Sequence, residues 1–158
     1  MIPSDIPFLA SETTLAEFIQ GFEQGTWPHA AWTHSAHLAM AAWYLLSLPE
    51  SEVTDRVRRG IQHYNESVGT RNTPDAGYHE TLTLFWLAIV SDYLGRRDGQ
   101  ATKLAVIREV VAEFASQRDL YRRYYSFDVV NSREARAKWV PPGQPWNFQG
   151  NKNTLGNI

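Results

Sequence analysis

Two clusters of histidines are the side chains best suited to chemistry in this chain of 158 residues. His34 and His37 form the first cluster, and their three-residue spacing places both imidazoles on one face of a helix, about 4.5 Å apart along its axis. Residues 38–48, which follow, carry no charge. We therefore expect this helix to be buried on most sides, and at least one imidazole to be buried and hydrogen-bonded or coordinated.

The second cluster is Tyr78, His79, Glu80 and Thr83, directly before the apolar residues 84–90. His79 and Thr83 share a helix face, while Glu80 lies in the first turn, where a carboxylate complements the helix dipole. Polar side chains that lead straight into an apolar helix are uncommon. We expect Tyr78 and Thr83 to contact a ligand.

The two clusters predict one site if their helices face each other. Imidazoles from His34, His37 and His79, with Glu80 as a fourth ligand or a partner, would suit zinc, iron, nickel or manganese. Without a metal, the same residues predict a polar pocket for a small molecule, in which His79 and Glu80 could act as acid and base. In the structural alternative, Thr33 caps the helix, His34 and His37 hydrogen-bond to backbone or solvent, and Glu80 complements the helix dipole.

A third candidate is Tyr125 together with residues 132–142. Arg136 lies three residues from both Arg133 and Trp139, which would let it hold a carboxylate or phosphate against an aromatic wall. The alternative is an ordinary solvated helix face. We expect Tyr125 and Arg136 to bind a ligand, and residues 125–142 to close the pocket.

Three sequence blocks in residues 18–142 resemble a family of small uncharacterised bacterial proteins. The blocks are Trp32-Thr33-His34-x-x-His37-Leu38, Tyr78-His79-Glu80-Thr81-x-Thr83, and Tyr125-Ser126 with Ala135-Arg136-x-x-Trp139-Val140-Pro141-Pro142. An acidic residue usually follows the last block in that family, whereas Gly143 stands here. The resemblance implies that the blocks form one site, and it implies no particular reaction.

Apolar residues recur three and four apart almost throughout, which predicts an all-α fold. We expect a single-domain helical bundle of about five main helices in residues 1–142, with a short C-terminal helix and an irregular tail in residues 143–158. The main helices should begin near Ser11 or Thr13, Thr26-Trp27-Pro28, Ser51, Tyr78 and Thr102, and shorter helical pieces should cover residues 119–125 and 132–139.

Composition excludes several classes of function. The net charge is -2 without long runs of either sign, so neither nucleic acid nor a membrane surface is an expected partner. There is no cysteine, which excludes disulfides and thiolate metal sites. We find no secretion signal and no apolar stretch long enough to span a bilayer, and therefore expect a cytoplasmic protein.

The leading hypothesis is a small-molecule ligand in the histidine-lined pocket, with catalysis left open. The alternative is a non-catalytic structural or interaction protein, in which the histidines are hydrogen-bonding residues of the core. Six Trp, seven Tyr and seven Phe, with Trp146 and Phe148 in the tail, would then build a homodimer interface.

Overall fold

The computed structural model describes residues 5–143, which form α-helices joined by turns and short 3-10 helices. The α-helices are α1 (Glu12–Gln24), α2 (His34–Ser47), α3 (Glu50–Ser67), α4 (Glu80–Arg96), α5 (Lys103–Phe114) and α6 (Arg133–Ala137). Residues 5–143 contain no β-strand, which confirms the all-α prediction of five main helices and a short C-terminal one. No helix in this range is long and apolar enough to span a membrane.

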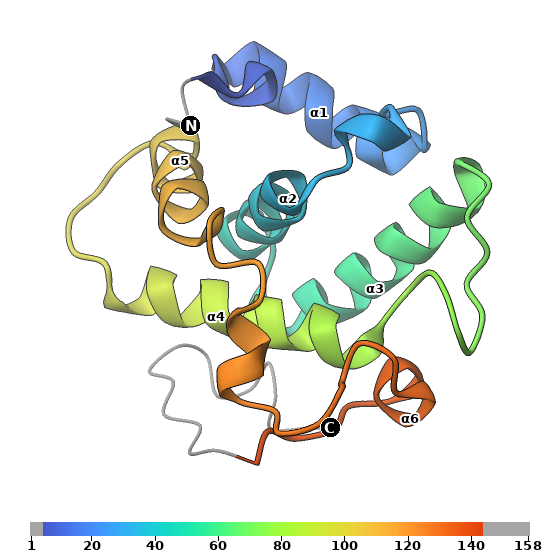
Figure 1. Cartoon of the computed structure of the whole chain (residues 1–158). Coiled ribbons are helices and arrows are strands. Elements are labelled where there is room, and N and C mark those ends of the chain that lie inside the picture. Colours follow the sequence, from blue (N-terminus) through green and yellow to red (C-terminus); the bar gives the residue numbers. More distant parts are fainter. Residues whose placement is uncertain (1–4, 144–158) are drawn as a thin grey trace.

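Helix α2 lies at the centre of the fold, with α1 above it, α5 and α3 on either side and α4 below (Figure 1). It packs on α3, α4 and α5. Because residues 38–48 are uncharged, this helix can be covered on most sides without burying an unpaired charge. Its buried residues are Ala36, Leu38, Ala39, Met40, Ala41, Ala42 and Tyr44.

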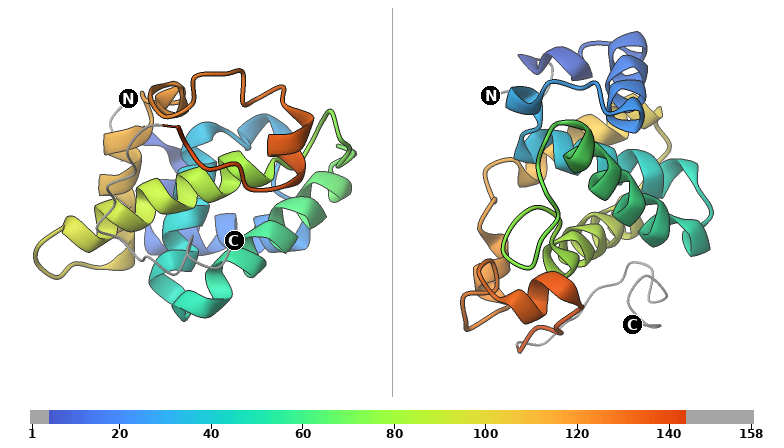
Figure 2. Two further views of the ribbon diagram at one scale, coloured as in Figure 1. Left: turned by 90° about the horizontal axis from the view of Figure 1, so that it is seen from below. Right: turned by 90° about the vertical axis from the view of Figure 1, so that its right-hand side faces the viewer.

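Helix α4 lies between two hydrophobic clusters. Leu84 and Leu87 belong to the main core shared with α2, whereas Phe85 and Ile89 belong to a smaller cluster built with residues 120–140. Figure 2 shows residues 120–143, here called the C-terminal segment, which include α6 and lie against α4 on the side away from α2. The N-terminal end of α4 is therefore covered from both sides.

Hydrogen bonds fix the C-terminal segment to α4. The buried Thr81 hydroxyl donates to the Lys138 carbonyl at 2.8 Å and accepts from the Val140 amide at 3.0 Å. The Tyr125 hydroxyl donates to the Val140 carbonyl at 2.7 Å. Thr81 thus uses its hydroxyl to hold the segment in place.

The predicted start of α2, at Thr26-Trp27-Pro28, is wrong by six to eight residues. Residues 26–33 form a turn and the 3-10 helix η3 (His29–Ala31), and α2 begins only at His34. Thr33 has extended backbone angles, and its hydroxyl accepts from the Ala36 amide at 3.3 Å. A polar cap next to the apolar stretch therefore determines the start of α2, instead of the proline at position 28.

The other helix starts agree more closely with the sequence. Ser11 and Thr102 cap α1 and α5 as predicted. Helix α3 begins at Glu50 after Pro49, so Ser51 lies inside its first turn and does not cap it. Helix α4 begins at Glu80, which leaves Tyr78 outside the helix and His79 at its N-cap.

Candidate functional site

A cavity of about 890 Å³ lies where α2, α3 and α4 meet the segment that follows α5. His34, His37 and His79 all line it, together with Tyr78 and Thr83. The structure therefore brings the two predicted histidine clusters to one cavity. The other lining residues are His29, Trp32, Thr33, Met40, Ala41, Val57, Ile61, Asn65, Thr70, Gly77, Leu82, Trp86, Leu87, Ser116, Arg118, Asp119, Tyr121, Arg122 and Val130.

His37 is held by the end of its own helix and by an aromatic ring. Its Nδ1 lies 2.8 Å from the Thr33 carbonyl oxygen. A carbonyl only accepts, so Nδ1 carries the proton and Nε2 keeps a lone pair. The imidazole packs on Trp32 with ring centroids 4.0 Å apart.

His34 is held by a neighbouring helix. Its Nε2 lies 3.1 Å from the Phe114 carbonyl oxygen at the end of α5 and donates its proton there, which leaves the lone pair on Nδ1. The ring meets Trp86 edge to face, with centroids 4.7 Å apart. Within residues 5–143, neither His34 Nδ1 nor His37 Nε2 has a hydrogen-bond partner, and both atoms are accessible to solvent, because no buried side-chain nitrogen or oxygen in this range lacks one. The cavity lining therefore offers two acceptors.

Both imidazoles are neutral at physiological pH. Burial lowers the pKa of His37 to about 4, outweighing the hydrogen bond to Thr33, and the neighbouring His34 and Arg118 lower it further by disfavouring a second positive charge. Burial likewise lowers the pKa of His34, against the opposing effect of the Phe114 carbonyl. The two rings therefore offer nitrogen lone pairs to a ligand and carry no positive charge.

The pKa of His37 predicts a loss of stability in mild acid. The unfolded chain takes up a proton near the ordinary histidine pKa of 6.5, whereas the folded chain resists protonation until about 4. As the pH falls from about 7.5 to about 5, the free energy of unfolding should therefore drop by about 2 kcal/mol from His37 alone. Urea unfolding at the two pH values measures this. The His37→Gln variant should show a weaker pH dependence by that amount, and an unchanged dependence would contradict the burial of a neutral ring.

His79 uses both ring nitrogens for structure. Nδ1 accepts from the Leu82 amide at 3.1 Å and so caps α4, while Nε2 donates to the Val129 carbonyl at 2.9 Å. Gly77 sets the turn before it with a φ of 80°, where a Cβ would lie 2.4 Å from the Arg71 carbonyl oxygen. The predicted acid-base and metal roles of His79 are corrected, because neither nitrogen is left for a ligand.

The predicted three-histidine metal site is also corrected. In the part of the chain that the structure describes, no group of three His, Cys, Asp or Glu side chains is placed to hold a metal ion. His34, His37 and His79 each donate one ring proton to a backbone carbonyl. They share a cavity, but they do not share a position for a metal.

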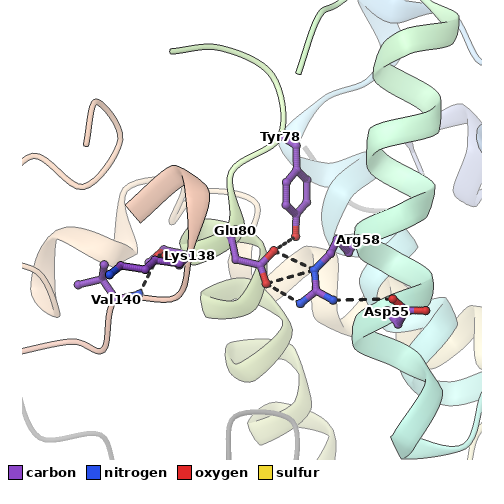
Figure 3. Close-up of polar contacts among 7 residues, drawn as sticks. Asp55, Arg58, Tyr78, Glu80, Lys138 and Val140 are labelled. Atoms are coloured by element: carbon purple, nitrogen blue, oxygen red, sulfur yellow. Dashed lines mark hydrogen bonds and ion pairs between the residues drawn. The ribbon is translucent and has the colours of Figure 1, made fainter. Parts of the chain in front are cut away.

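Glu80 does not line the cavity, and its carboxylate points toward Arg58 on α3 (Figure 3). Its carboxylate accepts from Arg58 Nε at 3.0 and 3.2 Å and from the Tyr78 hydroxyl at 2.6 Å. Burial alone would raise the pKa of Glu80, but the hydrogen bonds from Arg58 and Tyr78 outweigh it and lower the pKa. The expected catalytic role is thus replaced by an ion pair that joins α3 to α4.

Arg136 and Tyr125 do not line the cavity, which corrects their predicted contact with a ligand there. The Arg136 guanidinium donates to the Gly77 carbonyl at 2.8 Å and to the Val130 carbonyl at 3.2 Å. It fixes the C-terminal segment to the turn before α4, as the Tyr125 hydroxyl does through Val140. Tyr125 and Arg136, from the third sequence block, therefore hold the surrounding segments in place without lining the cavity.

The segment that follows α5 lines the cavity, although the sequence pattern did not predict it. Arg118, Asp119 and Arg122 come from residues 116–122, whereas residues 125–142 contribute only Val130. The available signal was the spacing of Arg118 and Arg122, four residues apart on either side of an aromatic residue. Such a pair in a short irregular segment is too common to identify a site.

Comparisons of the chain with protein-family models, curated proteins and solved structures found no match. The resemblance to a bacterial family stays a prediction. Trp146 and Phe148, on which the predicted homodimer interface depends, lie outside the described residues.

Proposed function

We propose that this protein binds a small organic molecule in the cavity between α2 and α4. The proposal rests on one observation: residues from three distant parts of the chain line the same cavity. These are His34 and His37, Tyr78 and Thr83, and residues of the segment 116–122. Two imidazole lone pairs in that space have no hydrogen-bond partner within residues 5–143. Polar groups that line a cavity beside an apolar core and stay open to a ligand are typical of functional sites.

The cavity walls favour a flat, partly apolar ligand. Trp32 and Trp86 support the two imidazoles, and Met40 and Leu87 continue the apolar surface. The volume of about 890 Å³ is in the range of sites for drug-sized molecules. A few polar acceptors on such a surface would orient the ligand.

His37 supports binding better than catalysis. A general base is most effective when its pKa is near the working pH, and the pKa of His37 is lowered to about 4 by burial. With Nδ1 donating to the Thr33 carbonyl, Nε2 is suited to accept a hydrogen bond from a ligand. Cytoplasmic location and the absence of a nucleic-acid partner belong to the same proposal, and they rest on charge pattern and sequence alone.

Filling the cavity tests the proposal. Thr83 is half-buried on the cavity face of α4, so Thr83→Trp should occupy the space, whereas Thr83→Val keeps its volume. We expect small-molecule hits found by saturation-transfer NMR on the wild-type chain to lose affinity by about tenfold or more in Thr83→Trp, and by less than about threefold in Thr83→Val. Hits that bind all three proteins equally, or no hits at all, would overturn the proposal.

A further inference from the structure

The charged side chains on the cavity wall are two arginines and one aspartate, Arg118, Arg122 and Asp119. Within residues 5–143, the side chains of Arg118 and Arg122 form no hydrogen bond or ion pair, although Arg122 lies close enough to Asp128 to help lower the pKa of that carboxyl. By contrast, Arg97 and Arg58, elsewhere in the fold, pair with carboxylates. Among the described residues, the Arg118 side chain is therefore a cation at the cavity that has no acceptor.

The backbone adds to this positive potential. Helix α2 begins at His34 and α4 is capped by His79, and both residues line the cavity, so the positive ends of two helix dipoles meet there. Glu80 offsets the dipole of α4, whereas the first turn of α2 contains no acidic residue. An anion would be attracted to the cavity both by the arginines and by α2.

The imidazoles determine which part of a ligand can lie beside them. A neutral ring that offers only a lone pair repels a carboxylate and accepts from an O–H or N–H group. The anionic end of a ligand must therefore lie toward Arg118, and a hydrogen-bond donor must lie toward His37 Nε2.

Resting on the proposed function, we propose that the ligand is a small aromatic carboxylic acid that also carries a hydroxyl or N–H donor. Its carboxylate is held by Arg118, its donor is accepted by Nε2 of His37, and its ring lies against the apolar lining around Trp86, Met40 and Leu87. Arg122, farther along the same segment, adds positive charge to the cavity lining. The two arginines thus select a ligand with an acid group, and His37 selects a ligand with a hydrogen-bond donor.

Three matched probes separate these contributions: 6-hydroxy-2-naphthoate, 2-naphthoate without the donor, and 6-hydroxy-2-naphthamide without the charge. We expect isothermal titration calorimetry on the full chain to show that Arg118→Gln weakens binding of both carboxylates by about tenfold and leaves the amide unchanged. The control is Arg123→Gln, which removes the same charge from an exposed arginine in the same segment that does not line the cavity. It should change no affinity by more than about twofold.

The donor contact has its own readout. The hydroxyl should improve naphthoate binding by about fivefold in the wild-type chain, and that advantage should disappear in His37→Leu. Equal binding of acid and amide, or equal effects of Arg118→Gln and Arg123→Gln, would overturn the acid preference while the cavity remains a binding site. A wild-type chain that binds none of the three probes would overturn the preference together with the proposed function.

Discussion

Replacing Glu80 by alanine is expected to lower the free energy of unfolding by about 3 kcal/mol. The Glu80 side chain is only 10% exposed, and it accepts hydrogen bonds from Arg58 and Tyr78. Removing the carboxylate leaves a guanidinium that is one-third exposed with only the exposed Asp55, 3.8 Å away, as an ionic partner, and a buried phenol without its acceptor. We expect the lower end of the range for broken buried pairs, because water can still reach Arg58. Urea unfolding at neutral pH measures the loss.

Two comparisons separate burial from pairing. The Arg133–Asp75 pair is also bidentate, with distances of 2.7 and 2.6 Å, but both side chains are more than 60% exposed, so Arg133→Ala should change stability far less than Glu80→Ala does. The double variant Arg58→Met with Glu80→Leu should recover much of the loss caused by Glu80→Ala, because it leaves no unpaired charge. If Glu80→Ala and Arg133→Ala had equal effects, burial would not be what makes the α3–α4 pair important.

Helices could be predicted from the sequence wherever an apolar pattern and a polar cap agreed. Ser11 and Thr102 stand directly before such patterns, and both cap as expected. The start of α2 failed because two signals competed: Pro28 is compatible with a first helical turn, but Thr33 lies next to the apolar stretch and its hydroxyl caps the helix. Residues 26–33 carry no continuous apolar face that would favour extending the helix backward.

The meeting of the histidine clusters could also be predicted, since polar groups next to two apolar helices tend to lie where those helices pack together. The role of each imidazole, however, could not be predicted from the sequence. His34 and His79 are oriented by the carbonyls of Phe114 and Val129, residues far away in the sequence that carry no signal of this kind. Backbone acceptors are the same for every residue type, so sequence patterns do not reveal which imidazole nitrogen is already occupied.

The arginines that line the cavity could not be identified from the sequence for a related reason. Arg118 and Arg122 lie on either side of the start of a 3-10 turn, η4 (Leu120–Arg123), where no periodicity assigns a face to either side chain. Arg136, in a more regular helical pattern, was the better sequence candidate for an anion site, yet its guanidinium is occupied by the carbonyls of Gly77 and Val130. Which arginine is available to a ligand depends on tertiary contacts that only the structure supplies.

Substitution of His79 should destabilise the fold far more than substitution of His37. His79→Ala removes both the cap of α4 and the contact with the Val129 carbonyl, each of which contributes about 1 kcal/mol, so the free energy of unfolding should fall by about 2 to 3 kcal/mol. His79→Asn should recover about 1 kcal/mol, because asparagine is a good N-cap but does not reach Val129. Thermal and urea unfolding at neutral pH measure both variants.

His37→Gln is the matched comparison for His79. An amide can still donate to the Thr33 carbonyl, and the lone pair at Nε2 makes no contact within residues 5–143, so stability at neutral pH should change by less than about 1 kcal/mol. Replacing a histidine whose hydrogen bonds hold the fold together lowers the stability of the protein, whereas replacing a histidine that binds only a ligand does not. If His37→Gln destabilised the chain as much as His79→Ala, both rings would be part of the core, and the cavity would lose the acceptor on which ligand orientation depends.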